Sequence, residues 1–341
     1  METEEAVRDY YGKSLTSSND LTTTNVIQCS RNAGKLATFV TEALSLVHED
    51  ITNRTYGCAT AYPEALDGAK VLDLGAGCGR DCFVLSNIVG EEGTVVGLDM
   101  TDELLQLARD KVDYHTSKYG YAKPNVSFVK GYMENMKEAG INDDFFDVIV
   151  SNCVISLCTD KRAVLREAYR VLKPGGELYF SDMYREGQLP PEVLDDKKLW
   201  CEGLIGALTC AELHDIAKEL GFTTPCVVRA SSLPILDEEI ENKLGQVRYA
   251  SVTYRLFKRL NRNDQDNKTS AFVKYLGGIR GCEDGFTFDK VYTFKKGKMT
   301  AVDPEVANIL STSRFVTFFD VVLAAEQSTH SFQIVDPFKL I

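Results

Sequence analysis

The sequence predicts an α/β protein built on a parallel sheet that helices cover on both faces. Between residues 67 and 183, short apolar runs alternate with stretches whose apolar residues recur at helical spacing. The first apolar run leads into a glycine-rich loop, DLGAGCG from Asp73, and a helical pattern follows this loop. Strands connected in this way have right-handed crossovers, so a ligand is expected at the carboxyl ends of the strands.

Each element of this core is predicted by its own pattern. Five apolar runs are expected to be strands: Lys70–Leu74, Thr94–Asp99, VSFVKG from Val126, Phe146–Asn152 and GELYFSD from Gly176. Helices are expected over 81–89, from Thr101 and from Asp160. The third helix should stop before Pro174, because proline lacks the backbone N–H that a helix needs.

Beyond Met183 the alternation lapses. Helices are expected over 192–207 and 210–220, and Thr209 with Glu212 forms a capping box for the second of them. Residues 250–257 and 286–294 are expected to be strands of a different, mainly antiparallel unit. The polar stretch 261–268 is the candidate linker.

Composition narrows the classes of function. The net charge of −12 disfavours nucleic acid, because affinity for phosphates comes from Lys and Arg. One basic cluster is expected to be a solvated face rather than a binding patch. It comprises Arg255, Lys258, Arg259 and Arg262.

The chain is also expected to be a soluble, cytoplasmic monomer without a membrane partner. Its start, METEEAVRDY, is acidic and lacks the apolar segment of a secretory signal. The apolar stretch 315–325 is interrupted by Asp320 and is shorter than the roughly 20 residues that span a bilayer. In a reducing compartment the ten cysteines are expected to serve packing, metal binding or thiol chemistry. A structural zinc site is poorly supported, since no C-x-x-C pair occurs and the four histidines are scattered.

The glycine loop and the next strand predict an S-adenosylmethionine site. Gly75, Gly77 and Gly79 stand at alternating positions, closer than the G-x-G-x-x-G of a dinucleotide site. Asp99 ends the second strand, where its carboxylate can accept hydrogen bonds from both ribose hydroxyls, and Met100 would flank the adenine. A purely structural turn is the alternative interpretation.

A cysteine follows the fourth strand, where methyl acceptors are usually held. Methyltransferases that act on amino groups carry Asn or Asp followed by Pro-Pro-Tyr there, whereas this chain has Asn152 and Cys153 in SNCV. Cys153 alone would more often be a buried structural residue. Cys29 and Cys58, in a segment that could fold over the sheet, could complete a three-thiolate cage with it.

With these motifs the chain resembles the arsenite methyltransferase family over nearly its whole length. SNCVISL from Ser151 and YGC from Tyr56 are the most specific matches. The others are Cys29, DLGAGCGRDC from Asp73, GLDM from Gly97, DYHTSKYGY from Asp113, EAYRVLKPGGELYFSDMY from Glu167 and GGI near Gly278.

The resemblance implies three domains, and the segment that precedes them is expected to be a flap. Residues 1–66 would form a flap carrying Cys29 and Cys58, and residues 67–183 a Rossmann-like class I methyltransferase domain. Residues 184–260 would form an arsenic-binding domain, and residues 261–341 a smaller α+β carboxyl-terminal domain. The cofactor site is expected to comprise Tyr56, Asp73, Gly75, Ala76, Gly77, Arg80, Asp99, Met100, Tyr132, Met133, Glu134 and Asn152.

The implied substrate is trivalent arsenic delivered as a thiol complex, and the implied products are mono- and dimethylated arsenicals. Arsenic(III) is soft, so thiolates displace its oxygen or glutathione ligands. Its lone pair can attack the sulfonium methyl without a general base, since no proton leaves the nucleophile. Tyr56 resembles the residue that contacts the sulfonium, although core packing is an alternative. Glutathione or thioredoxin would restore the enzyme.

The chain departs from the family pattern at the fourth cysteine. That thiol is expected three residues after the tryptophan, but Trp200 is followed by Cys201 and then by Gly203 at the expected position. On a continuous helix two residues turn a side chain by about 200°, so Cys201 would face away unless the helix is distorted. Cys210, at the start of a capped helix, competes with Cys201 as the arsenic ligand. If neither thiol reaches the site, fewer protein ligands would hold arsenic, and the stage of methylation or the preferred arsenical would differ.

The other cysteines are expected to be structural or exposed. Cys82 should pack on the following helix, with a regulatory disulfide as its alternative role. The remaining members of this group are Cys78, Cys158, Cys226 and Cys282. Two rival functions also remain open at this point: methylation of another small-molecule acceptor, and binding of arsenicals without catalysis.

Overall fold

The computed structural model describes residues 2–14, 36–55, 62–260, 269–327 and 333–341. Cys29, Tyr56 and Cys58 lie outside these residues, as do Arg262 and the candidate linker 261–268, so the predictions made for them are not tested by the structure.

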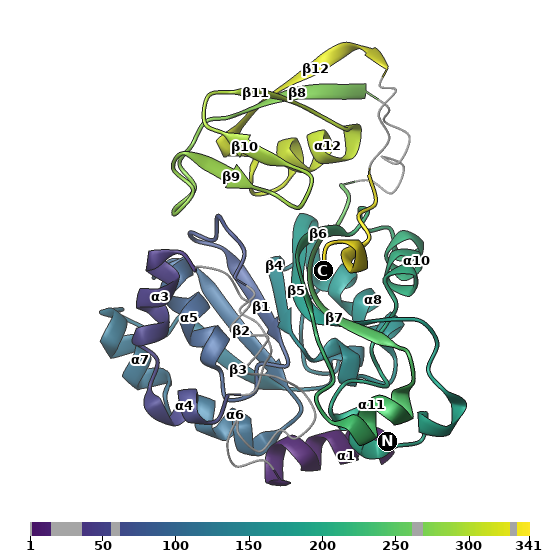
Figure 1. The fold of residues 1–341 in the computed structure, drawn as a ribbon. Helices are drawn as coiled ribbons and strands as arrows, with labels where there is room; N and C mark the ends of the chain where they lie inside the picture. The colour runs from purple at the N-terminus through teal and green to yellow at the C-terminus, as the bar shows by residue number, and fades with distance from the viewer. Residues whose placement is uncertain (1, 15–35, 56–61, 261–268, 328–332) are drawn as a thin grey trace.

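A central sheet dominates the described residues (Figure 1). Its strand order is β3-β2-β1-β4-β5-β7-β6. The parallel strands are β1 (Lys70–Leu74), β2 (Thr94–Asp99), β3 (Val126–Lys130), β4 (Phe146–Asn152) and β5 (Leu172–Glu186). All five predicted strands are confirmed, and the α/β fold with them.

Two antiparallel strands complete this sheet, β7 (Arg248–Phe257) and β6 (Cys226–Ser232). The prediction that residues 250–257 belong to a different unit was wrong, because β7 pairs with β5 from Glu177↔Phe257 to Glu186↔Arg248. Every residue of β7 after the first is buried, and a strand buried on both faces carries no pattern that identifies its partner. Residues 184–260 therefore supply part of the sheet that residues 67–183 begin.

Helices cover both faces of the sheet, and alternate strand residues point to different helices. Val71 packs in a cluster with the helices α3 (Thr38–Ser45) and α5 (Arg80–Val89), whereas Leu72 packs in a cluster with α8 (Lys161–Val171) and α10 (Cys210–Leu220). The predicted capping box of α10 is confirmed, and Asp160 caps α8. The helix expected from Thr101 is two helices, α6 (Asp102–Arg109) and α7 (Val112–Tyr119).

The helix expected over 192–207 was largely wrong. Only η5 (Pro191–Val193) and α9 (Lys197–Cys201) are helical there. Gly203 follows with a φ of +80°, a left-handed conformation that ends a helix and that glycine adopts without strain.

The remaining elements lie around this core. They are α1 (Glu2–Asp9), the π-helical turn η1 (Tyr10–Ser14), α4 (Glu49–Asn53), η3 (Met133–Asn135), η4 (Ile155–Leu157), α11 (Glu238–Leu244), η7 (Val316–Phe318) and η8 (Pro337–Lys339). Across the described ranges, no helix has both the length and the apolar character needed to cross a bilayer.

The carboxyl-terminal unit has a sheet of its own. Its strands β11 (Met299–Val302), β8 (Thr269–Tyr275) and β12 (Phe319–Gln327) are antiparallel, and α12 (Pro304–Thr312) packs against them. The strand expected over 286–294 is instead a hairpin of β9 (Gly285–Thr287) and β10 (Thr293–Lys295). Asp289 makes the turn by accepting hydrogen bonds from the backbone N–H groups of Val291 and Tyr292.

The basic cluster joins this unit to the central sheet, so its prediction as a solvated face was wrong. Arg255 is fully buried and pairs with Glu177 at 2.8 Å and Glu64 at 2.9 Å, and Arg314 of the carboxyl-terminal unit pairs with Glu177 as well. In Figure 1 this unit lies at the top of the sheet, opposite α1. The other described members of the cluster are also paired: Lys258 with Asp144, and Arg259 with Glu305.

Candidate active site

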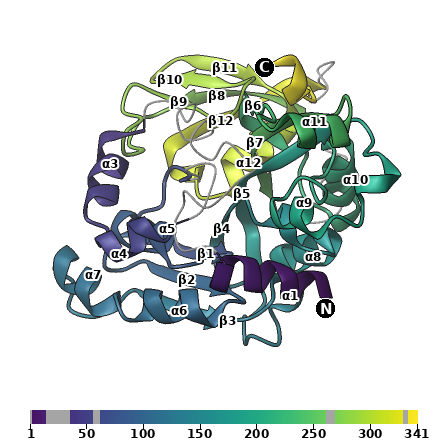
Figure 2. The same cartoon turned by 60° about the horizontal axis from the view of Figure 1, so that its bottom comes forward.

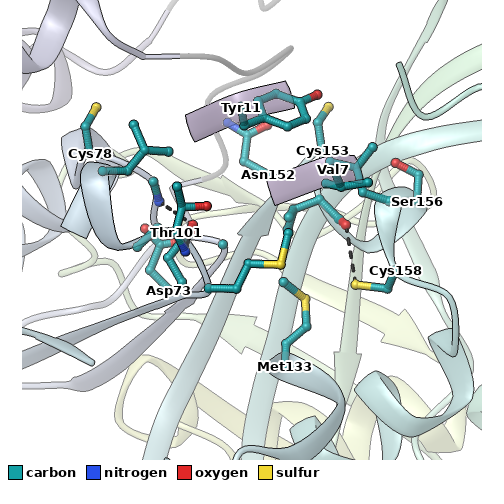
Figure 3. A pocket seen from close by; sticks show the side chains of 18 of the residues that line it. Val7, Tyr11, Asp73, Cys78, Thr101, Met133, Asn152, Cys153, Ser156 and Cys158 are labelled. Atoms are coloured by element: carbon teal, nitrogen blue, oxygen red, sulfur yellow. Dashed lines mark hydrogen bonds between the residues drawn. The ribbon is translucent and has the colours of Figure 1, made fainter. Parts of the chain in front are cut away.

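A cavity that is open to solvent lies at the carboxyl ends of β1, β2 and β4. Figure 2 shows α1 crossing this end of the sheet, and Figure 3 shows part of the cavity lining. This is the position that the order of strands and helices predicts for a ligand.

The glycine loop after β1 brings the backbone to the cavity. Gly75 and Gly77 have φ values of +72° and +54°, and a Cβ on Gly75 would lie 2.6 Å from the Val154 side chain. A side chain at Gly75 would therefore collide with the loop after β4. Asp73, near the end of β1, is buried. Burial raises the pKa of its carboxyl well above the ordinary value.

Asp99 lines the cavity at the end of β2 and is held by the backbone. Its carboxylate oxygens accept hydrogen bonds from the N–H groups of Gly77 and Thr101, both at 2.8 Å. Burial raises the pKa of Asp99, although these backbone donors oppose the rise. A carboxylate oriented in this way can still accept hydrogen bonds from a diol that enters the cavity.

Most of the predicted cofactor residues come together at this cavity. The predicted cofactor residues that line it are Asp73, Gly75, Ala76, Gly77, Arg80, Asp99, Met100, Tyr132, Met133, Glu134 and Asn152. They come from the ends of four different strands, β1 to β4, which lie side by side in the sheet.

Sequence reasoning missed Asp81, the centre of the polar network in this cavity. Its carboxylate accepts hydrogen bonds from Arg80 Nε at 2.7 Å, Tyr62 Oη at 2.7 Å and Asn152 Nδ2 at 3.3 Å. Burial would raise the pKa of Asp81, but the charge of Arg80 together with the hydrogen bonds from Arg80, Tyr62 and Asn152 lowers the pKa overall. Asp81 therefore links the segment before β1 to the end of β4.

The amino-terminal segment also lines the cavity, and it too was missed. Val7 of α1 and Tyr11 of η1 face into it. Tyr10 Oη donates a 2.5 Å hydrogen bond to Glu202 Oε1, and Tyr11 Oη donates a 3.1 Å hydrogen bond to the backbone carbonyl of Cys201. The paired aromatics YYG were the available signal, but nothing local shows that they contact residues nearly 200 positions away.

Cys153 is placed in the cavity wall directly after β4. It is half-buried, and its N–H donates a 2.8 Å hydrogen bond to the Ser181 carbonyl of β5. Its φ of +54° is unusual for a residue with a side chain and stores strain. In Figure 3 Cys153 lies on the side of Asn152 and Ser156, away from Cys78 and Thr101.

Cys201 and Cys210, the two candidates for the fourth thiol of the arsenic site, do not line the cavity. Cys201 is 4 % exposed, packs with Val7 and Leu157, and is not part of the cavity lining. Cys210, the first residue of α10, packs against the core cluster to which α8 and α10 contribute, and it does not line the cavity either. Burial raises the pKa of both thiols.

Three other thiols lie near the cavity, and each donates a hydrogen bond to a neighbouring residue. Cys158 lines it and donates to the Val154 carbonyl at 3.6 Å (Figure 3), and Cys78 lines it and contacts backbone carbonyls before residue 56. Cys82 is fully buried in α5, as predicted, and its thiol donates a 3.1 Å hydrogen bond to Asp73. Burial raises the pKa of all three thiols.

Two family models match this chain. Residues 65–233 match a methyltransferase domain, and residues 268–341 match an arsenite methyltransferase carboxyl-terminal domain.

Named relatives extend over nearly the whole chain. Arsenite methyltransferase from Homo sapiens is 44% identical over 99% of this chain and 91% of its own length, and that from Mus musculus is 43% identical over 98% and 90%. A protein of the same name from Aquipseudomonas alcaligenes is 42% identical over 93% and 90%. Among solved structures, an arsenic(III) S-adenosylmethionine methyltransferase from Chlamydomonas reinhardtii superposes with a TM-score of 0.81 at 36% identity, covering 88% of this chain and all of that one.

Proposed function

Because the chain belongs to the arsenite methyltransferase family, we propose that it transfers methyl groups from S-adenosylmethionine to thiol-bound trivalent arsenic, giving mono- and dimethylated arsenicals. The observation that carries this proposal is the position of Cys153, whose thiol shares one cavity with Asp99 and the glycine loop.

The residues around the cavity fit the methyl donor. S-adenosylmethionine supplies an electrophilic methyl group on a positively charged sulfur. Asp99 would accept hydrogen bonds from the ribose hydroxyls, Met100 would flank the adenine, and Gly75 and Gly77 leave the loop open to close approach. Tyr56 would contact the sulfonium.

On the acceptor side, Cys153 and Cys58 would hold arsenic, with Cys29 and Cys201 as the further predicted thiols. Thiolates suit a soft ion and leave its lone pair available. The lone pair forms the arsenic–carbon bond while the methyl–sulfur bond breaks, and that bond's electron pair stays on the departing sulfur. Since no proton is transferred, Cys153 needs no base beside it.

This transfer raises arsenic formally from the trivalent to the pentavalent state. Two electrons return it to the trivalent state, and two thiolates can supply them by forming a disulfide. Glutathione or thioredoxin would then reduce that disulfide, as expected for a monomeric enzyme that works in the reducing cytoplasm.

The test is incubation of the purified protein with labelled S-adenosylmethionine, arsenite and glutathione. We expect labelled methylarsenicals from the wild type, and at least a hundredfold slower formation in Cys58→Ser and Cys153→Ser. Cys282→Ser is the matched control, because this half-buried thiol lies in the carboxyl-terminal unit and should leave the rate unchanged.

The rival functions predict different results. An enzyme for another acceptor would keep its turnover in Cys153→Ser, and a non-catalytic binder would hold arsenic without releasing labelled product. Methyl transfer to arsenic that survives both substitutions would refute the roles proposed for these thiols.

A further inference from the structure

The amino-terminal segment formed by α1 and η1 is attached to two different parts of the cavity lining (Figure 2). Tyr10 Oη donates a 2.5 Å hydrogen bond to Glu202 Oε1, a distance typical of a hydroxyl bonded to a carboxylate. Gly12 packs at the start of α6, where a Cβ built on it would lie 2.9 Å from Thr101 Cγ2. Glu202 follows α9 and Thr101 precedes α6, so η1 connects elements that lie far apart in the sequence.

The same segment contributes side chains to the cavity. Val7 and Tyr11 line it. Val7 is buried in a cluster with Leu157, and Met100 packs against this cluster. Met100 and Leu157 also line the cavity, and Met100 is the residue expected to flank adenine. In Figure 3 Tyr11 lies on the Cys153 side of the cavity, so the segment reaches from the adenine end to the acceptor end.

The position of α1 depends on its contacts with the rest of the protein. It has eight residues, and isolated helices shorter than roughly 12–15 residues are marginal in water. A ligand that touches Val7 and Tyr11 adds van der Waals contacts to those that hold the segment in place. By linkage, a ligand that binds the covered form more tightly stabilises that form, and loss of the covered form weakens the ligand.

We propose that α1 and η1 form a cover that retains the methyl donor: Val7 and Tyr11 contact the donor, and Tyr10 is the positioning residue that holds the cover to Glu202. This inference rests on the methyl-donor half of the proposed function and on no arsenic ligand. Tyr10 does not itself line the cavity, so its effect on the donor passes through the cover. The donor leaves when the cover opens, as with other mobile elements over active sites.

Tyr10→Phe removes the hydroxyl that donates to Glu202 and keeps the aromatic ring. We expect S-adenosylmethionine to dissociate from the full-length variant about tenfold faster or more, because a hydrogen bond to a charged group is lost from the covered form. Stopped-flow displacement of labelled S-adenosylmethionine, without arsenic, would measure the rate. The midpoint of urea unfolding should stay unchanged, since the fold does not depend on this hydrogen bond. A smaller acceleration would overturn the role of Tyr10.

Tyr292→Phe is the matched control. Tyr292 Oη donates a 2.9 Å hydrogen bond to Asp303 in the carboxyl-terminal unit, so this variant also removes a hydroxyl bonded to a carboxylate. It should leave the dissociation rate of S-adenosylmethionine unchanged. Equal acceleration in both variants would refute a specific effect of the cover.

Gly12→Ala tests the attachment of the cover to α6. The φ of Gly12 is not left-handed, so alanine fits the backbone, and the new Cβ would crowd Thr101 Cγ2. We expect faster dissociation of S-adenosylmethionine from this variant. Thr101→Ser in the same chain removes Cγ2 and should slow the dissociation again. An unchanged rate in Gly12→Ala, or no recovery in the double variant, would contradict this attachment.

Hydrogen exchange measured by mass spectrometry follows the cover directly. We expect the amides of residues 3–13 to exchange about tenfold more slowly or less with S-adenosylmethionine than without it, because opening of the segment limits their exchange. The amides of β8 in the carboxyl-terminal unit are the internal reference and should not change. Equal exchange of residues 3–13 with and without S-adenosylmethionine would overturn the proposal.

Failure of the function and failure of the cover look different. If the wild type does not bind S-adenosylmethionine, the proposed function fails. If the wild type methylates arsenite while Tyr10→Phe and Gly12→Ala retain S-adenosylmethionine as long as the wild type does, only the cover proposal fails.

Discussion

At the scale of single residues, Asp99 shows how the fold prepares a side chain for a ligand. Two backbone N–H groups fix its carboxylate before anything binds, so little rotational freedom remains to be lost on binding. A ligand with a diol would then meet an acceptor that is already oriented.

We expect Asp99→Ala to weaken S-adenosylmethionine binding by at least about 100-fold, because each of the two hydrogen bonds from the ribose hydroxyls to this charged group would contribute about 1.5–3 kcal/mol. Isothermal titration calorimetry would measure the change. Asp102→Ala is the control, since this carboxylate pairs with Lys130 at the exposed start of α6. A similar loss in both variants would contradict a specific role for Asp99.

Residues in the glycine loop and after β4 could be placed at the site from sequence, because each directly follows an apolar run that predicts a strand. Asp81 could not, since its partners Tyr62 and Asn152 are distant in sequence and belong to no motif with it. Met183 directly follows a strand that the sequence predicts. The close approach of its Cε to Gly203, however, depends on where α9 ends.

At the scale of elements, α7 is fixed to the amino-terminal helices through a neutral histidine. His115 is fully buried and stacks on Phe83 of α5, with ring centroids 3.6 Å apart. Its Nε2 accepts a hydrogen bond from the His48 N–H at the start of α4, and its Nδ1 donates to the Lys111 carbonyl. A proton on Nε2 would break the bond to His48.

This arrangement predicts acid sensitivity. Burial lowers the pKa of His115 from 6.5 to about 4, so the unfolded chain takes up a proton first as the pH falls. The stabilisation is complete above pH 6.5 and is lost progressively toward pH 4, with about 2 kcal/mol lost between pH 7.5 and pH 5. Urea unfolding at the two pH values would measure this loss.

His115→Phe keeps an aromatic ring against Phe83 but cannot take up the proton. It should be less stable than the wild type at pH 7.5, yet lose about 2 kcal/mol less between pH 7.5 and pH 5. An unchanged pH dependence would show that His115 is not responsible.

Element prediction succeeded where local signals were strong and failed where tertiary contacts decide. The capping residues Asp160 and Thr209 define the starts of α8 and α10 within a residue. The helix expected over 192–207 was too long, because its apolar residues pack around an irregular turn that Gly203 makes possible. Sequence alone shows that Gly203 permits distortion, not that distortion occurs.

At the scale of the whole molecule, a buried ion network couples the two sheets. Glu177 is fully buried between Arg255 of β7 and Arg314 of the carboxyl-terminal unit, and Arg255 also lies over the ring of Phe288. The five parallel strands of the central sheet were readable from sequence, whereas β6 and the carboxyl-terminal strands β8, β11 and β12 were not predicted. The joint between the two units was not predicted either, since a run of basic residues looks the same whether it is solvated or buried against acids.

Glu177→Gln should destabilise the protein by about 3–5 kcal/mol, because it leaves two buried guanidinium groups without their shared carboxylate. Urea unfolding would measure this loss, and proteolysis should then cut first within the carboxyl-terminal unit. Asp320→Asn, in an exposed 2.9 Å pair with Lys274, is the control and should change stability by less than about 1 kcal/mol. Comparable losses in both variants would refute the special role of the buried network.

The hydrogen bond between Tyr10 and Glu202 can form only late in synthesis of the chain. The two residues are separated by 192 positions, so Tyr10 leaves the ribosomal exit tunnel long before Glu202, which directly follows α9, has been synthesised. At about 5–20 residues per second, the wait is on the order of 10–40 s. Until then the hydrogen bond between Tyr10 and Glu202 cannot form, so this part of the cavity lining is completed only after the chain up to Glu202 has emerged.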